Sequence, residues 1–265
     1  MRPTEARLPR LTRSDWHIHT HHSDCGHPEA TPEAIVRAAQ QAGLEAIGIT
    51  DHIVLPRDRK RPERARRELP PDLGGLRVYI GCEANMQSPT RASIDARFAA
   101  GLDYVVMAAS HLFHPGVEEC RDLSPRSMAA FILRLMEGAV TSGLADIIAH
   151  PFSVPECPVA WRYIIEELDL GALSGVAAAA ARAGVAVELN PRFLREEPAA
   201  TRRLFDPILD GGCKVAISSD AHHPSSVGCR GPAYAAEHEV RALGVTPERL
   251  WRIEDRVSAA RRSPA

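Results

Sequence analysis

Seven short apolar segments, each separated from the next by a longer stretch with helical character, most constrain the fold of this chain. They are the opening stretch 15–24 and residues 46–50, 77–82, 104–109, 147–149, 185–189 and 215–218. This alternation predicts an α/β fold in which parallel strands are covered by helices. Because such sheets carry their chemistry beyond the carboxyl ends of the strands, the residues that follow each segment are the first candidates for function.

Residues suited to metal binding and catalysis follow these segments. Histidines follow the second, fourth and fifth (His52, His111 and His150), and acidic residues follow the third and seventh (Glu83 and Asp220). An open doubly wound sheet would spread these residues along a crevice, whereas a barrel brings all strand ends to one mouth. We therefore predict a distorted seven-stranded (β/α)7 TIM-like barrel with a metal site at the C-terminal mouth of its strands.

The opening segment supplies the strongest single motif, because His17 and His19 alternate along an apolar run. Alternate residues of a strand point to the same face, so both imidazoles can approach one ion. Mixed imidazole and carboxylate ligands suit zinc, manganese or iron, whereas an all-oxygen set would favour magnesium. Together with the other strand ends, this pair predicts a site for several metal ions.

The composition narrows the class of protein. The 265 residues fit one large domain, which we place at 15–258 between tails at 1–14 and 259–265. A net charge of −2 gives no strong field toward nucleic acid or an anionic membrane. Six cysteines without a CxxC pair argue against a zinc finger or a disulfide framework and favour a reduced, cytoplasmic setting. No apolar run is long enough to span a bilayer.

These motifs together resemble the PHP (polymerase and histidinol phosphatase) family of phosphoesterases. The matching pieces occur in the family's order and are His17-Ile18-His19-Thr20, Asp24, Thr50-Asp51-His52, Gly81-Cys82-Glu83, Ser110-His111, Ala149-His150-Pro151, Glu188-Leu189-Asn190 and Ser219-Asp220-Ala221-His222. The resemblance runs from Asp15 to about Gly228. It implies a distorted seven-stranded (β/α) barrel, which agrees with the number of apolar segments.

Carried over to this chain, the resemblance implies up to three divalent ions, which would be zinc, manganese or iron. The ligands of the first ion would be His17, His19, Glu83 and Asp220. Glu83 would bridge to a second ion, completed by His111 and His150, and the third ion would be held by Asp24, His52 and His222. Family members place the ligand after the HxH pair at slightly different spacing, so Cys25 and His27 are alternatives to Asp24.

Such a site predicts hydrolysis of a phosphate monoester by a metal-activated hydroxide. Clustered divalent ions neutralise phosphate oxygens, lower the pKa of a bound water and stabilise the leaving oxygen. The candidate catalytic residues are Glu83, Asp220 and His222. Arg192 and Arg195, which follow the sixth segment, are candidates for binding the substrate phosphate in bidentate fashion.

Other polar residues receive supporting or solvent-exposed roles. Candidate outer partners of the ligands are Asp51, Ser110, Asn190 and Ser218. Histidines without a place in the pattern are expected at the surface or behind the ligands, and these are His21, His22, His114, His223 and His238. The basic run 57–67 is interpreted as a solvated loop that could overhang the site, and residues 247–260 as a helix.

Four functions are consistent with these residues. A stand-alone chain of this size resembles the histidinol-phosphate phosphatase branch of the family, which implies a small phosphorylated substrate rather than a nucleic acid or membrane. A nuclease or nucleotide phosphoesterase is supported by the basic run alone. A non-catalytic, metal-stabilised interaction domain would be expected to lack some of the ligands. An amidohydrolase also uses HxH and a late Asp, but commonly has a lysine where this chain has Ser110-His111.

Overall fold

The strands form two sheets at the centre of the molecule. The computed structural model describes residues 11, 13–155, 157–230 and 232–256. One sheet has three parallel strands in the order β1 (Ser14–Ile18), β2 (Ala46–Ile49) and β4 (Arg77–Ile80). The order of the other sheet is β10 (Val215–Ile217), β9 (Ala186–Leu189), β8 (Ile147–Ala149), β7 (Val105–Ala108), β5 (Cys82–Ser88) and β3 (His52–Ile53). Its strands are parallel, apart from β6 (Arg91–Ala92), which pairs antiparallel with β5.

Two of the seven apolar segments pass from one sheet into the other, which joins the sheets along the chain. Two residues separate the end of β2 from the start of β3, and Gly81 alone separates β4 from β5. An isolated bridge between Ile18 and Ala221 links β1 to the segment after β10. The predicted α/β fold with parallel strands is therefore confirmed, but the described residues form two sheets, and the predicted seven-stranded ring is not confirmed.

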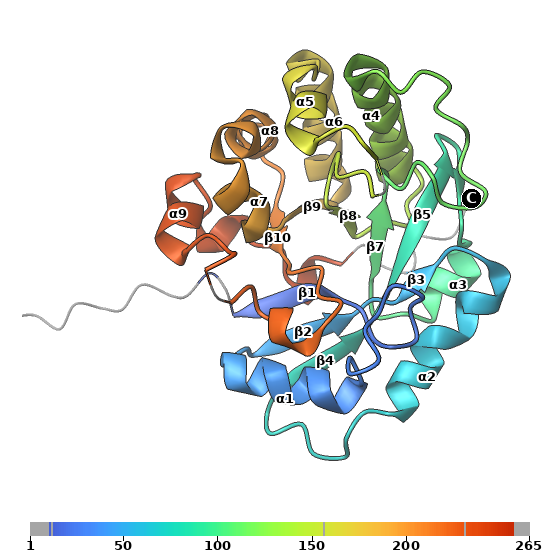
Figure 1. Cartoon of the computed structure of the whole chain (residues 1–265), viewed down its shortest axis with the longest axis vertical. Helices are drawn as coiled ribbons and strands as arrows, with labels where there is room; N and C mark the ends of the chain where they lie inside the picture. Colours follow the sequence, from blue (N-terminus) through green and yellow to red (C-terminus); the bar gives the residue numbers. More distant parts are fainter. Residues whose placement is uncertain (1–10, 12, 156, 231, 257–265) are drawn as a thin grey trace, which may run out of the picture.

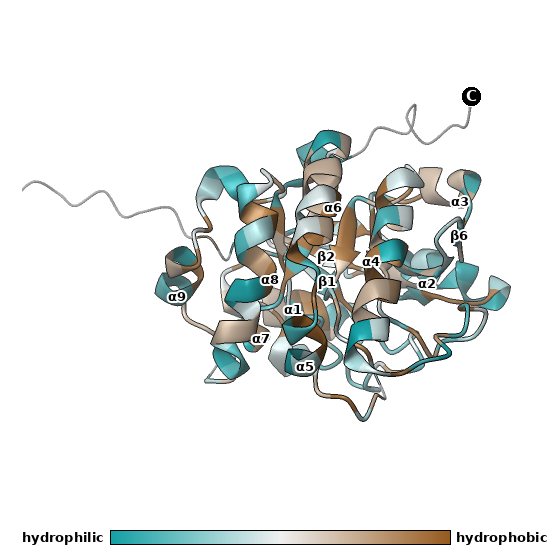
Figure 2. Ribbon diagram, turned by 90° about the horizontal axis from the view of Figure 1, so that it is seen from above, coloured by the Kyte–Doolittle hydropathy of each residue, from teal (hydrophilic) through white to brown (hydrophobic). Residues whose placement is uncertain are grey.

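Helices cover the strands on both sides (Figure 1). Beside the three-stranded sheet lies α1 (Pro32–Ala42), which Thr31 caps at its start and Gly43, with φ 66°, at its end. α4 (Pro125–Thr141), α6 (Leu170–Ala183) and α8 (Pro198–Asp210) lie side by side along the second sheet, and Figure 2 shows that their apolar surface alternates with polar stripes. Burial of these apolar stripes against the strands forms the main core.

The remaining elements are short. The helices among them are α2 (Arg61–Arg67), α3 (Ala96–Ala100), α5 (Trp161–Glu166), α7 (Pro191–Glu196) and α9 (Glu237–Ala242). Turns of 3-10 helix occupy Pro56–Lys60, Pro224–Ser226, Pro247–Arg249 and Ile253–Asp255. The basic run, expected to be a loop, is thus helical for most of its length.

The helix predicted over 247–260 is wrong for its described part, which holds only two short turns. Trp251 N–H donates to the carbonyl of Val215 over 2.8 Å, so this segment lies along the edge of β10 instead of coiling. The Trp251 ring packs against Trp16, with ring centroids 5.0 Å apart and planes at 90°. Burial of this large side chain at the strand edge explains why helical spacing was misleading here.

The predicted tails, 1–14 and 259–265, lie largely outside the described residues, although β1 already begins at Ser14. Within the part of the chain that the structure describes, no helix is long and apolar enough to cross a membrane.

Candidate metal centre

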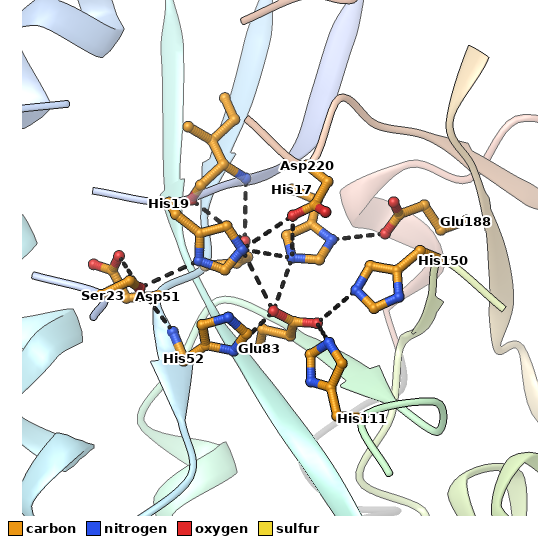
Figure 3. A network of polar contacts seen from close by, with 12 residues as sticks. His17, His19, Ser23, Asp51, His52, Glu83, His111, His150, Glu188 and Asp220 are labelled. Atoms are coloured by element: carbon orange, nitrogen blue, oxygen red, sulfur yellow. Dashed lines mark hydrogen bonds and ion pairs between the residues drawn. The ribbon is translucent and has the colours of Figure 1, made fainter. Parts of the chain in front are cut away.

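The carboxylate of Glu83 lies at the centre of the site, among the imidazoles of five histidines (Figure 3). Its Oε2 lies 3.2 Å from His17 Nε2, 3.4 Å from His19 Nε2 and 3.0 Å from His52 Nδ1. Its Oε1 lies 3.0 Å from His150 Nε2 and 3.5 Å from His111 Nε2. Glu83 is placed inside β5 rather than after the strand, and parallel pairing with β3 sets it beside His52.

Asp220 completes the side of the cluster that faces β1. Its Oδ1 lies 3.2 Å from His19 Nε2 and 3.6 Å from His17 Nε2, and these two nitrogens are themselves 3.1 Å apart. Asp220 has a φ of 51°, a left-handed conformation that Asp tolerates better than most residues. Backbone hydrogen bonds between Ala221 and both His17 and His19 fix this turn against β1.

Three of the histidines around Glu83 have a polar partner on the ring nitrogen that faces away from it. Glu188 Oε2 lies 2.7 Å from His17 Nδ1, and Asn85 Oδ1 lies 3.0 Å from His111 Nδ1. The Ser110 hydroxyl, predicted as an outer partner, lies 3.3 Å from His150 Nδ1. Such contacts fix the tautomer and leave Nε2 directed into the cluster.

His19 is oriented indirectly by Asp51, another predicted outer partner. The Ser23 hydroxyl lies 3.2 Å from His19 Nδ1 and donates to Asp51 Oδ1 over 2.8 Å. Asn190 Nδ2 donates to the carbonyl of Ser219 over 2.9 Å, next to Asp220, whereas Ser218 Oγ has no hydrogen-bond partner in the described part of the chain.

The sequence analysis did not predict three of these polar partners of the histidines, although all three lie in or beside the family motifs. Glu188 was quoted only as a motif residue, and Asn85 and Ser23 were not singled out. The alternation of residues along β5 was the available signal for Asn85, which stands two positions after Glu83 and so shares its face.

A further group of possible metal-binding atoms lies beside those around Glu83 and Asp220. The side chains of His19, Cys25, His52 and His222 bring one donor atom each to within 4.8 Å of one another. Burial raises the pKa of the Cys25 thiol, but hydrogen bonds with His222 and His52 outweigh burial and lower that pKa to about 7. Asp24, predicted at this place, is not brought into the cluster: its side chain is 83% exposed and pairs with Arg61.

The two arginines predicted to bind substrate lie outside the cluster. Arg192 is the second residue of α7, which follows β9, and its Nε lies 3.9 Å from Glu196 Oε1. Arg195 Nη1 lies 3.4 Å from Glu239 Oε1 on α9. Both side chains are about half exposed, and no contact described for either one reaches the clustered histidines.

The histidines outside the predicted ligand set divide into two kinds. His114 joins the edge of the cluster, since its ring centroid is 4.2 Å from that of His111 and 5.5 Å from that of His52. The others lie away from Glu83: His21 and His22 beside Glu68, His223 beside Glu29, and His238 exposed on α9.

The electrostatics of the cluster are those of a carboxylate surrounded by imidazoles. Burial alone would lower the pKa of His17, but the charges of Glu188 and Glu83 outweigh it and raise that pKa well above its usual value. Burial also opposes the charge on His52, yet Glu83 raises its pKa to about 10. Burial lowers the pKa of His19 to about 4. The cluster therefore combines protonated and neutral imidazoles, and metal ions can take the place of the protons.

The donor atoms fit divalent metal ions. Glu83 Oε2 and His52 Nδ1 are buried, close together and without a hydrogen-bond partner of suitable geometry in the structure. Burying such groups without a partner is costly, and an ion between them removes that cost. Imidazole with carboxylate is a donor set typical of zinc, iron and manganese. Fold and site together define an α/β protein with a candidate centre for divalent metal ions.

The chain belongs to the PHP family: the model of the PHP domain matches residues 15–191. A protein of Deinococcus radiodurans named "Probable histidinol-phosphatase" is 29% identical over 258 residues, covering 87% of this chain and 93% of that protein. A "Probable phosphatase" of Edwardsiella ictaluri is 30% identical over 249 residues, covering 89% and 91%.

A solved structure shares the fold. It is the histidinol phosphate phosphatase of Lactococcus lactis subsp. lactis complexed with zinc, L-histidinol and phosphate. The TM-score is 0.57 at 18% sequence identity, with 88% of this chain and 92% of that chain covered. The predicted family and the predicted class, a metal-dependent hydrolase of phosphoric esters, are confirmed by these comparisons.

Proposed function

We propose that this protein hydrolyses the phosphate monoester of a small molecule, and that histidinol phosphate is the first substrate to test. The observation that carries the proposal is the placement of Glu83, whose two oxygens face different sets of imidazoles. A carboxylate in that position suits two ions held side by side, an arrangement that activates water and clamps a phosphoryl group. The names of the relatives support the choice of substrate.

The proposed ligands follow the distances in the cluster. The first ion would bind to His17, His19, Glu83 and Asp220, and the second to Glu83, His111 and His150. His52 and His222 would contribute to a third, and we propose zinc, manganese or iron at these positions. When bound, the ions neutralise phosphate oxygens and lower the pKa of the water that attacks phosphorus.

The two carboxylates of the cluster have different proposed tasks. Glu83 is fully buried, so it holds its position and exchanges no proton with solvent. The side chain of Asp220 is 24% exposed, and although burial opposes its charge, His17 and His19 keep its pKa low and the group ionised. We therefore propose that Asp220 acts as an ionised ligand of the first ion that substrate can reach, with His222 at the rim held by its Nδ1–H bond to the Asp220 carbonyl.

The proposal also covers the domain organisation, the cellular location and the binding of the substrate phosphate. We propose that residues 15–258 act as one domain in which the two sheets make a distorted barrel, since β4 leads through Gly81 into β5 and Ile18 pairs with Ala221. The cysteine pattern supports a cytoplasmic location. Binding of the substrate phosphate by Arg192 or Arg195 would require each arginine to leave its present glutamate partner.

A nuclease function is less well supported, because four of the seven basic residues in the run 57–67 are paired with acidic side chains. Arg61 pairs with Asp24 and Asp58, Arg59 pairs with Asp95, and Arg67 pairs with Glu63. Charges compensated in this way give little attraction to a polyanion.

Phosphate release by the zinc- or manganese-loaded protein tests the proposal. Histidinol phosphate, an aryl phosphate and a short oligonucleotide are compared, and we expect turnover of the monoesters with a preference for histidinol phosphate. Glu83→Gln should lower kcat by about a thousandfold, since the ions supply several kcal/mol of transition-state stabilisation. Glu137→Gln, an exposed carboxylate on α4, is the matched control. Turnover of the oligonucleotide alone, or full activity in Glu83→Gln, would contradict the proposal.

A further inference from the structure

The turn after the HxH strand directs Cys25, and not Asp24, toward the histidines. Donor atoms of Cys25, His52 and His222 all lie within 4.8 Å of one another, together with that of His19. Four donors around a zinc ion at ordinary bond lengths stand roughly 3.3–3.6 Å apart, so small side-chain movements bring this group to coordination distance. The thiol is therefore a member of a donor cluster rather than an isolated cysteine.

Asp24 is held away from this cluster by an ion pair. Its Oδ1 lies 3.0 Å from Arg61 Nη2, and Arg61 is itself held by Asp58 at 3.1 Å and by the carbonyl of His52 at 2.9 Å. Arg61 is largely buried, so this arrangement is part of the fold and not a chance surface contact. Turning Asp24 inward would leave Arg61 with fewer partners in a place that is poor in water.

The backbone of the turn is equally constrained. Gly26 N–H donates to the carbonyl of Ser23 over 2.9 Å, and a Cβ at Gly26 would lie 2.0 Å from the carbonyl oxygen of Thr20. His27, the other alternative ligand, has its ring against His223, with centroids 4.7 Å apart, and its Nδ1 accepts from Glu29 N–H. The tight turn leaves Cys25 as the residue between Ser23 and His27 that faces the histidines.

We propose that Cys25, bound as a thiolate, is the sulfur ligand of the third ion together with His52 and His222. The thiol proton is released to solvent when the metal–sulfur bond forms. Sulfur prefers zinc, ferrous iron or cobalt to manganese or magnesium, so this position selects a different ion from one built on oxygen ligands. The inference rests on the proposed function only in that the cluster binds metal.

Cobalt substitution provides a direct test. A thiolate bound to Co²⁺ gives a charge-transfer absorption in the near ultraviolet that imidazole and carboxylate ligands do not give. We expect this absorption in the unaltered protein, its loss in Cys25→Ser and Cys25→Asp, and its retention in Asp24→Ala. Cys120→Ser, which removes a thiol that donates to the carbonyl of Asp122, is the matched cysteine control and should also retain it.

Two further measurements complete the test. Zinc titration with a chelating indicator should show that affinity at one site falls on the order of 10- to 100-fold in Cys25→Ser, with the other sites unchanged. Cys25→Asp should recover manganese binding there, which also shows that the variant folds. Charge-transfer absorption that persists in Cys25→Ser, or loss of an ion in Asp24→Ala alone, would overturn the inference. Phosphate release is assayed separately, so absorption without turnover contradicts the proposed function and leaves the thiolate ligand standing.

Discussion

Glu188 is buried, and its hydrogen bond to the metal-binding cluster in the described part of the chain is made with His17. Its Oε2 lies 2.7 Å from His17 Nδ1, which makes His17 more basic and directs its Nε2 toward Glu83. We expect Glu188→Gln to keep the fold and weaken metal binding at the first position by about 10- to 100-fold. Competition with a chelating indicator measures this, with the exposed Glu166 on α5 changed to Gln as control. Equal affinities in both variants would show that the contact is only structural.

Proton release on metal binding follows from the pKa of His52. Glu83 outweighs burial and raises this pKa to about 10, so at pH 8 His52 of the metal-free protein is protonated and must lose its proton to an entering ion. Zinc affinity should therefore rise with pH up to about 10. Calorimetry in two buffers of different ionisation enthalpy counts the protons. The count should fall in Glu83→Gln and remain unchanged in the exposed His238→Asn.

For single residues, the sequence predicts which side chains can bind metal better than it predicts where those side chains point. His17, Glu83 and His150 could be anticipated because donor residues recur at strand ends. The choice between Asp24 and Cys25 could not, since neighbouring residues in a turn point in opposite directions. That choice depends on Arg61, an arginine 37 positions farther along the chain than Asp24, whose burial no local pattern reveals.

Gly48 is the most constrained position in β2. A Cβ there would lie 1.7 Å from the hydroxyl oxygen of Tyr104, which donates to the carbonyl of Trp16 over 2.6 Å. We expect Gly48→Ala to lower the free energy of unfolding by about 3 kcal/mol, because the tyrosine must move and its hydrogen bond is lost. Gly175→Ala on α6, where a Cβ meets open space, should instead raise it by up to about 1 kcal/mol. Urea denaturation of the chelator-treated proteins measures both, and similar values for the two variants would refute this reading of the packing.

The elements themselves were predicted with uneven success. All seven apolar segments form strands, because uninterrupted apolar runs of this length suit a strand buried on both faces. The passages from β2 to β3 and from β4 to β5 were not predicted, since each depends on two sheets meeting. The helix over 247–260 failed because pairing with β10 and burial of Trp251 outweigh helical spacing.

At the scale of the whole molecule, metal ions should stabilise the fold, because the donor residues come from or follow β1, β3, β5, β7, β8 and β10. Free zinc at a hundred times its dissociation constant contributes about 2.7 kcal/mol, provided that the unfolded chain does not bind it. For a chain of this size we expect the melting temperature to rise by about 5–10 °C over that of the chelator-treated protein. Differential scanning calorimetry measures this difference. A rise of the same size in Glu83→Gln would exclude the cluster as its source.

The pairing of Ile18 with Ala221 also bears on how the protein acquires metal as it is made. This bridge unites donors from β1 with donors from the turn after β10, so the complete set spans His17 to His222. A nascent chain still attached to the ribosome exposes the HxH pair long before its partners have been synthesised. Tight metal capture is therefore a late event in biosynthesis, and a ribosome stalled before residue 222 would hold a chain that scavenges ions poorly.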